Sequence, residues 1–276
     1  MLGAQPPGGR EVVLPGRGTT WMVEAGGPQG APTLLLFHGW SATAWVNWHV
    51  VLPDLARRYR VVAMDVRGHG RGIRPRGPFR LADCADDGAA LCHHLGVGAV
   101  VAVGYSMGGA IAQLMWHRHR HRVRGLVLCS TAGLFGRRPP VPPPVKAAMV
   151  GMAQGLRALP RPLQAEVIKR ALGNRDRPPW VVEERSASDL RCLVEAAMEL
   201  NGFDGAGVLR LIDVPTAVVK TTADGVVDPA RQQAMADAIP GAVVMEVDGG
   251  HDACVVPGGP FLGALLAACE AVTATP

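Results

Sequence analysis

Residues 97–115, VGAVVAVGYSMGGAIAQLM, decide the fold of this chain. The stretch begins with a run of Val and Ala, which is typical of a strand that is buried on both faces of a sheet. It then passes through GYSMGG at 104–109 and continues with small apolar residues that predict the start of a helix. Glycine at 104 and 108 permits a sharp turn between strand and helix, because a Cβ at either position would collide across it.

Ser106 lies at the apex of this predicted turn. A serine in such a turn adopts a strained backbone conformation that exposes its hydroxyl group. The hydroxyl then lies at the carboxyl end of the sheet and at the positive end of the next helix, where an attacking alkoxide and a developing oxyanion are both stabilised. The sequence therefore predicts that Ser106 is a nucleophile. We reject the alternative interpretation as a membrane span, because four glycines, a serine and a glutamine interrupt the apolar run.

Composition places the chain among globular proteins. It has 276 residues, of which 48% are hydrophobic and 18% charged, which suffices for one large α/β domain or two small ones. The net charge of +5 is assigned to solvent-exposed arginine clusters, because no nucleic-acid-binding motif accompanies them. The six cysteines have no paired spacing and are interpreted as buried thiols in a reducing compartment.

The amino-terminal residues, MLGAQPPGGRE, lack the basic start and the apolar stretch of a secretory signal. We therefore expect a cytoplasmic protein without an integral membrane segment. The expected partner is a small-molecule substrate and not a nucleic acid, and a homodimer stays open. Neither a metal nor a cofactor is expected.

Strands and helices alternate along most of the chain. Besides the strand before Ser106, strands are predicted over 11–15, 20–25, 33–37, 61–64, 125–129, 216–221 and 242–247. Helices are predicted over 45–58, 79–95, 229–238 and 260–272 and directly after Ser106. The alternation predicts an α/β fold with a mostly parallel eight-stranded sheet and helices on both faces.

Residues 134–206 depart from this alternation. They contain nine prolines, which separate helical pieces predicted over 145–157, 163–172 and 180–200. Because the segment is too long for an ordinary crossover, we interpret it as a helical cap. The predicted domains are a core of residues 1–133 and 207–276 and a cap of residues 134–206.

A serine nucleophile needs a general base, and the base needs a carboxylate that fixes its tautomer. His251 follows the last predicted strand, so it should emerge at the same edge of the sheet as Ser106. We therefore assign His251 as the base. His38 and His69 are assigned instead to the stabilisation of their glycine-rich turns.

Two aspartates follow the strand predicted over 216–221. Asp224 is closer to the strand end, whereas Asp228 directly precedes Pro229 and is a candidate helix N-cap. We favour Asp224 as the carboxylate that orients His251. Asp228 stays the alternative.

The order and type of its motifs make the chain resemble the α/β-hydrolase fold. The motifs are HGW at 38–40, DVRGHG at 65–70, GYSMGG at 104–109, ADGVVDP at 223–229 and GGH at 249–251. The resemblance is closest to small bacterial esterases, cofactor-free haloperoxidases, enol-lactonases and C–C bond hydrolases. It covers nearly the whole chain outside the predicted cap.

The resemblance implies a role for each motif residue. Ser106, His251 and Asp224 would form a catalytic triad, and the backbone N–H groups of Trp40 and Met107 would form an oxyanion hole. Trp40 and Tyr105 are the residues that we expect to contact substrate.

The activity that the resemblance implies is that of a serine hydrolase. It would cleave a carboxylic ester or lactone of a small to medium apolar substrate through an acyl-enzyme. The same residues would also suit a C–C bond hydrolase or a thioesterase. A slow-turnover ligand-binding or biosynthetic accessory protein on the same fold is the alternative from a different class. Because residue 106 is Ser, the sequence argues against haloalkane dehalogenases and epoxide hydrolases, which use an Asp nucleophile.

Overall fold

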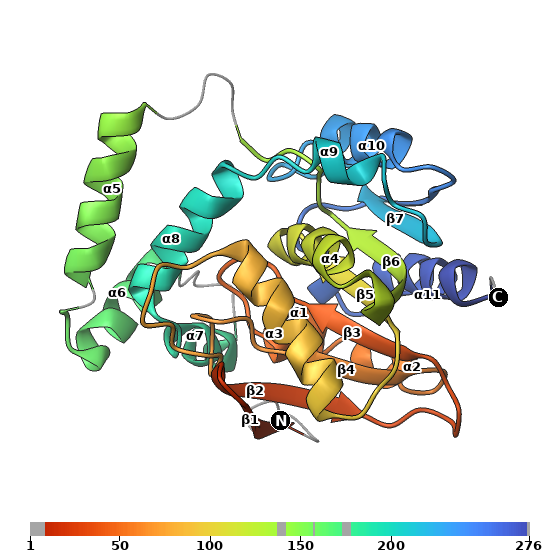
Figure 1. Cartoon of the computed structure of the whole chain (residues 1–276), viewed down its shortest axis with the longest axis horizontal. Helices are drawn as coiled ribbons and strands as arrows, with labels where there is room; N and C mark the ends of the chain where they lie inside the picture. The colour runs from red at the N-terminus through yellow and green to blue at the C-terminus, as the bar shows by residue number, and fades with distance from the viewer. Residues whose placement is uncertain (1–8, 137–141, 157, 173–177, 275–276) are drawn as a thin grey trace.

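A computed structural model describes residues 9–136, 142–156, 158–172 and 178–274 (Figure 1). The strands are β1 (Gly9–Leu14), β2 (Gly18–Ala25), β3 (Thr33–Phe37), β4 (Arg60–Met64), β5 (Val100–Tyr105), β6 (Val123–Cys129), β7 (Thr216–Thr221) and β8 (Val243–Val247). They form an eight-stranded sheet in the order β1-β2-β4-β3-β5-β6-β7-β8. β2 pairs antiparallel with β1 and with β4, and the remaining pairs are parallel. The predicted α/β class and mostly parallel sheet are confirmed.

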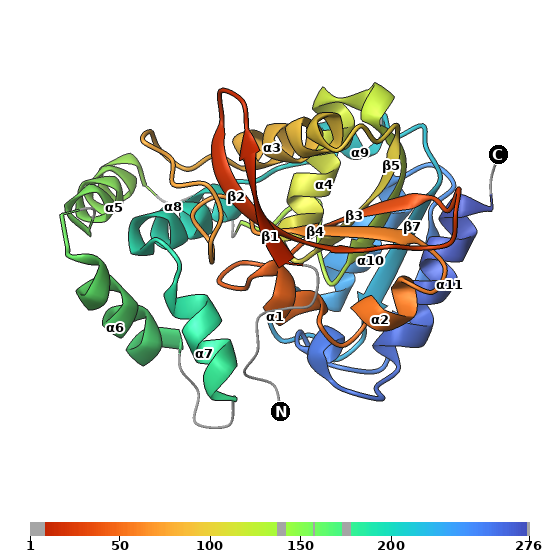
Figure 2. The ribbon, with the colours of Figure 1, turned by 90° about the horizontal axis from the view of Figure 1, so that it is seen from below.

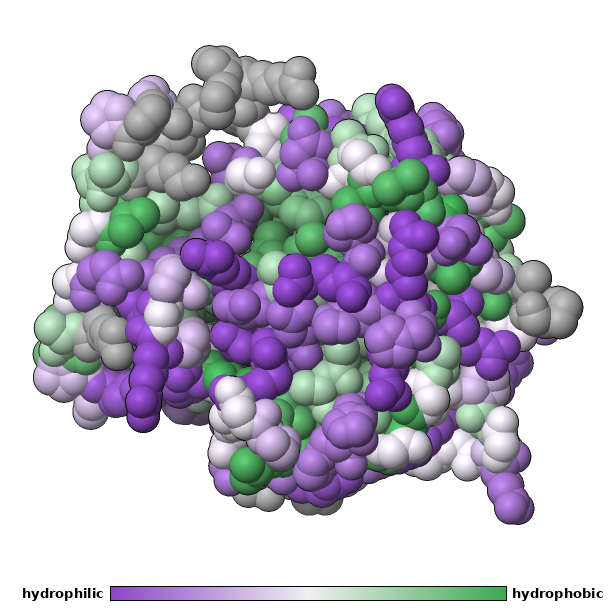
Figure 3. Space-filling view, in the orientation of Figure 1, coloured by the Kyte–Doolittle hydropathy of each residue, from purple (hydrophilic) through white to green (hydrophobic). Residues whose placement is uncertain are grey.

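Helices cover both faces of this sheet (Figure 2). One layer consists of α3 (Leu81–His94), α4 (Met107–Arg118) and α10 (Pro229–Ala238), and the other of α1 (Ala44–Trp48), α2 (Leu52–Leu55) and α11 (Phe261–Thr273). Leu35 and Phe37 of β3 belong to the first layer's core and Leu34 and Leu36 to the second's, because successive strand residues point to opposite faces. The surface over α3 and α4 is mainly hydrophilic at its centre (Figure 3), so these helices turn their apolar residues toward the sheet.

The helix predicted over 45–58 is wrong in its length. The structure has two short helices there, α1 and α2, and Pro53 lies in the first turn of α2. Proline has no N–H to donate, and its ring would clash with the His49 carbonyl group in a continuous helix. The chain therefore breaks before Pro53 and starts a new helical turn.

The segment between β6 and β7 is mainly helical. Its helices are α5 (Pro143–Leu156), α6 (Arg161–Leu172), α7 (Pro179–Ser186), α8 (Leu190–Asn201) and α9 (Ala206–Leu209). α5, α6 and α7 lie beyond one edge of the core layers in both views (Figures 1 and 2). The single helix predicted over 180–200 is wrong, because Asp189 starts a new helix by accepting a hydrogen bond from the Cys192 N–H at 3.1 Å. Among the described helices, none is long and apolar enough to cross a bilayer.

Two buried histidines stabilise the turns after β3 and β4. His38 Nδ1 donates to the Gly39 carbonyl oxygen at 2.8 Å, so its Nε2 can accept from the Val66 N–H at 2.9 Å. The ring of His69 lies 5.4 Å from the ring of His38. Burial lowers the pKa of His38 to about 4 and that of His69 to about 3, because a charged imidazolium would lose its hydration. Both rings are therefore neutral near pH 7.

The change His69→Phe should make the protein less sensitive to mild acid. His69 takes up a proton in the unfolded chain below its ordinary pKa of 6.5 but stays neutral in the folded protein down to about 3. Folding stability is therefore lost as the pH falls below 6.5, by about 1.4 kcal/mol per pH unit for one such histidine. Urea denaturation between about pH 6.5 and 5 should give a shallower slope for His69→Phe than for the wild type. Equal slopes would contradict a neutral buried His69.

Candidate active site

Ser106 lies at the sharp turn between β5 and α4. Its φ of 53° and ψ of −118° are outside the regions that residues other than glycine ordinarily occupy. A Cβ on Gly104 would clash with the Gly108 carbonyl oxygen, and a Cβ on Gly108 would clash with the carbonyl oxygen of Phe37. The structure therefore has the strand, strained turn and helix that the sequence predicts, and it needs glycine at both positions.

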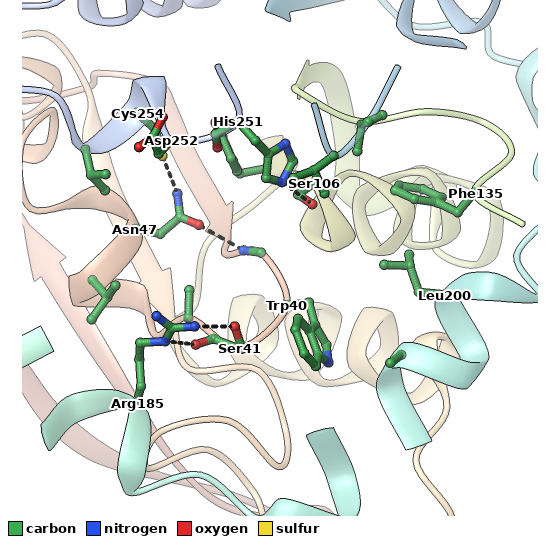
Figure 4. Close-up of a pocket in the computed structure, with 18 of the residues that line it drawn as sticks. Trp40, Ser41, Asn47, Ser106, Phe135, Arg185, Leu200, His251, Asp252 and Cys254 are labelled. Carbon is green, nitrogen blue, oxygen red and sulfur yellow. Dashed lines mark hydrogen bonds between the residues drawn. The ribbon is translucent and has the colours of Figure 1, made fainter. Parts of the chain in front are cut away.

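The Ser106 hydroxyl group is not used to cap the helix. A serine before a helix usually accepts a hydrogen bond from the first turn, but the Ser106 side chain makes no such bond. The backbone is held instead: the Ser106 N–H donates to the Cys129 carbonyl oxygen at 2.9 Å, and its carbonyl oxygen accepts from Thr131 Oγ1 at 2.7 Å. The hydroxyl oxygen lies 3.0 Å from His251 Nε2 (Figure 4).

His251 connects Ser106 to Asp224. It follows β8, and its Nδ1 lies 2.8 Å from Asp224 Oδ2. An ionised carboxylate only accepts hydrogen bonds, so Nδ1 carries the proton and Nε2 can accept from the Ser106 hydroxyl group. In this tautomer the imidazole can take the serine proton, as a general base must.

Asp224 is surrounded by hydrogen-bond donors. Its Oδ1 accepts from the N–H groups of Val226 at 2.8 Å and Val227 at 2.9 Å, and its Oδ2 accepts from Thr221 Oγ1 at 2.8 Å. Burial by itself would raise the pKa of the carboxyl group, but the hydrogen bonds from His251 and the backbone outweigh it, and the pKa is lowered. Asp224 is therefore ionised at neutral pH.

Asp228 lies outside this arrangement. Its side chain accepts from the Ala230 N–H at 2.8 Å and so caps α10, as the sequence suggested for it. The structure thus brings Ser106, His251 and Asp224 together and leaves Asp228 on the surface.

A pocket of about 490 Å³ lies against Ser106 and His251 (Figure 4). Its volume is in the range of small-molecule sites. Most of its side chains are apolar, and they come from the core and from the segment between β6 and β7 alike. They include Trp40, Val46, Phe135, Ala197, Leu200, Val226, Val227 and Val255. Within the described ranges, no three His, Cys, Asp or Glu side chains are grouped so that they could hold a metal ion.

The two predicted substrate contacts differ in position. Trp40 borders the pocket and is 37% exposed. Tyr105 also borders the pocket, but it is only 3% exposed and its hydroxyl group donates to the His251 carbonyl oxygen at 2.7 Å. Tyr105 therefore supports the His251 backbone from the border of the pocket, and its contact with a substrate stays a prediction.

The two predicted oxyanion-hole residues lie in different elements. Met107 is the first residue of α4, and Trp40 lies in the loop between β3 and α1. Asn47 fixes this loop, since its Oδ1 accepts from the Gly39 N–H at 2.9 Å while its Nδ2 donates to Cys254 Sγ at 3.4 Å. Asn47 thus connects the loop of Trp40 with the loop that follows His251. The sequence did not predict this role, because a single asparagine within a predicted helix belongs to no motif.

Comparison with known proteins agrees with the fold described above. A sequence profile described as alpha/beta hydrolase fold matches residues 32–161. The chain has the α/β-hydrolase fold. Among solved structures, the fold is similar to an enol-lactonase from Burkholderia xenovorans LB400, with a TM-score of 0.76 and 23% identity over 95% of this chain and 100% of that one. An esterase from Thermogutta terrifontis has a TM-score of 0.69 and 26% identity over 97% and 96% of the two chains.

Two relatives of this chain differ in how much of it they match. The magnesium-chelatase 30 kDa subunit of Rhodobacter capsulatus is 29% identical over 252 residues, which is 84% of each chain. The 2-hydroxymuconate semialdehyde hydrolase of Pseudomonas sp. (strain CF600) is 37% identical over 132 residues, which is 47% of this chain and 45% of that relative. The hydrolase match thus spans less than half of the relative's length.

The change Asp224→Asn should lower the free energy of unfolding by about 1–3 kcal/mol, because an amide NH2 group would face donors that now bond to the carboxylate. It should also shift the proton NMR resonance of the His251 Nδ1–H. Asp228→Asn is the matched control, since asparagine caps helices as well as aspartate does and the stability should change by less than about 0.5 kcal/mol. Urea denaturation and NMR of both variants would refute the pairing of Asp224 with His251 if the two changes had the same effects.

Proposed function

We propose that the protein is a serine hydrolase that cleaves a carboxylic ester or lactone of a small to medium apolar substrate. The observation that carries the proposal is the hydrogen-bonded series from Ser106 through His251 to Asp224, with distances of 3.0 and 2.8 Å, beside an apolar pocket. Relatives that are themselves named as hydrolases support it.

The reaction would proceed through an acyl-enzyme. Ser106 Oγ attacks the acyl carbonyl carbon while its proton passes to His251 Nε2, and ionised Asp224 stabilises the imidazolium. The N–H groups of Trp40 and Met107 stabilise the negative oxygen of the tetrahedral intermediate. The intermediate collapses when His251 gives its proton to the leaving alcohol oxygen. A water molecule, deprotonated by His251, then attacks the acyl-enzyme, and the acid is released as Ser106 regains its proton.

Residues 134–206 would act as a cap over this site, and residues 1–133 and 207–276 would be the catalytic core. Phe135, Ala197 and Leu200 of this segment border the same pocket as Ser106 and His251, which supports the division. A cap in this position would keep bulk water from the acyl-enzyme and would select the substrate by shape.

The change Ser106→Ala should abolish both labelling by a fluorophosphonate probe and hydrolysis of nitrophenyl esters. The reason is that no other group replaces the nucleophile.

Asp224→Asn should lower kcat by about 10⁴-fold, because His251 loses the tautomer that Asp224 fixes, whereas the kcat of Asp228→Asn should stay close to that of the wild type. A series of nitrophenyl esters with increasing acyl length would measure how long an acyl chain the pocket accepts. A wild-type protein that neither labels nor turns over any ester would refute the proposal.

A second candidate function is that of a subunit of a magnesium-inserting enzyme. The observation that favours it is the match to the magnesium-chelatase subunit over 84% of each chain, whereas the hydrolase match covers 47% of this chain. In that role the pocket would bind a ligand without needing turnover at Ser106.

Addition of the protein to a magnesium-chelatase assay tests this second function. If the pocket only binds, the wild type and Ser106→Ala should raise the rate of magnesium insertion equally, because the alanine variant keeps the pocket. A rate that neither protein changes would refute the subunit role. A gain with the wild type alone would show instead that the reaction at Ser106 is what matters.

A further inference from the structure

The loop between β3 and α1 is held by the helical segment as well as by the core. Arg185 of α7 donates from Nε to the Ser41 carbonyl oxygen and from Nη2 to Ser41 Oγ, both at 2.8 Å. Trp40 Nε1 donates to the Leu193 carbonyl oxygen of α8 at 2.8 Å. Figure 4 shows the Arg185 guanidinium group on Ser41, with Trp40 next to it along the loop. Two helices far along the sequence therefore bind neighbouring residues of one loop.

Ser41 has a backbone conformation that serine rarely adopts. Its φ is 58°, in the left-handed region, and the residue is 5% exposed. Such a conformation persists only where the surroundings over-determine it. Arg185 supplies this constraint, because its guanidinium group binds both the carbonyl oxygen and the hydroxyl group of the same residue. The fork geometry of arginine suits such a double contact, which a lysine could not reproduce.

The two residues next to Trp40 in the sequence are thus each held by a hydrogen bond from another element. Asn47 accepts from the Gly39 N–H at 2.9 Å on the core side, and Arg185 holds Ser41 on the side of the helical segment. Because the backbone on either side is fixed, the direction of the Trp40 N–H is fixed as well. Without Arg185, Ser41 would lose both of these hydrogen bonds, while the Trp40 side chain would keep its bond to Leu193.

We propose that Arg185 is a positioning residue for the oxyanion hole, through which the helical segment holds the Trp40 N–H in its reactive direction. The inference rests on the proposed serine hydrolase function. It adds that the oxyanion hole is complete only while α7 is docked on the loop. The next residue toward the amino terminus, Glu184, strengthens this docking, since it forms an ion pair with Arg71 of the core at 3.0 Å. The helical segment therefore contributes both to the wall of the pocket and to the support of the oxyanion hole.

The change Arg185→Met, which keeps the apolar stem, tests the proposal on a neutral nitrophenyl ester. kcat should fall about 10–100-fold, part of what the loss of a whole oxyanion donor costs, while KM changes by less than about threefold. Arg170→Met is the matched control, because the Arg170 side chain is 80% exposed on α6 and pairs with Glu166; both constants should stay unchanged. An equal loss in both variants would overturn the proposal.

The charge of the substrate separates positioning from direct binding. If Arg185 acts through Ser41, neutral and carboxylate-bearing esters should lose the same factor in Arg185→Met. A loss confined to the carboxylate-bearing esters, with a raised KM, would make Arg185 a substrate-binding residue and overturn the proposal. Guanidinium ion at low concentration should restore part of the activity of Arg185→Ala.

A milder variant, Ser41→Ala, breaks part of the same contact from the side of the loop. Ser41→Ala removes one of the two acceptors, so it should lower kcat by a smaller factor than the loss of Arg185. The double variant with Arg185→Ala should be no slower than Arg185→Ala alone, because both changes break the same contact. Losses that simply multiply would overturn the proposal.

Hydrogen exchange measures the loop without any turnover. The amides of residues 40–43 should exchange faster in Arg185→Met than in the wild type and should be unaffected in Arg170→Met. Unchanged exchange in an active hydrolase would overturn the present inference alone. Faster exchange in a protein that hydrolyses no ester would overturn the proposed function while supporting the contact between α7 and the loop.

Discussion

The turn between β5 and α4 is the constraint on which the site depends. At Gly104 and Gly108 the backbones of the strand, the helix and β3 approach so closely that no Cβ fits. The chain can pass only by placing Ser106 in a strained conformation, with φ at 53°. The strain is held by backbone contacts to the neighbouring strand and the loop after it, so the hydroxyl group is not needed as a helix cap. It is left available for His251.

The parallel sheet determines what the hydroxyl group meets. β5, β7 and β8 run in the same direction, so Ser106, Asp224 and His251 emerge at one edge although 145 positions separate the serine from the histidine. Donors around Asp224 then keep the carboxylate ionised in spite of its burial, and the carboxylate fixes the tautomer of His251. Tyr105, at the end of β5, holds the His251 backbone by donating a hydrogen bond to its carbonyl oxygen. Geometry and charge thus support the same direction of proton transfer.

The fold and the hydrogen-bonded residues do not by themselves select a reaction. Similar chains and structures carry the names of an esterase, an enol-lactonase and a chelatase subunit. The segment between β6 and β7 contributes to the surroundings of Ser106 in two ways. Phe135 and Leu200 give the pocket its apolar wall, and Arg185 fixes the loop of Trp40. The wall of the pocket and the loop of Trp40 therefore both depend on this segment.

The sequence by itself determined the features whose signals are local. The apolar run and the glycines of 97–115 specified the strand, turn and helix, and the Asp-Pro pair at 228–229 marked the start of α10 at the residue where the structure has it. The sequence did not predict the break within 180–200, because its apolar residues keep a helical spacing across the whole stretch. Only the structure shows that Asp189 caps a new helix there. The support that Arg185 gives to Ser41 was decided by tertiary structure alone. Its partners lie 144 positions apart, and only the packing of the helical segment against the core brings a guanidinium group to a strained loop.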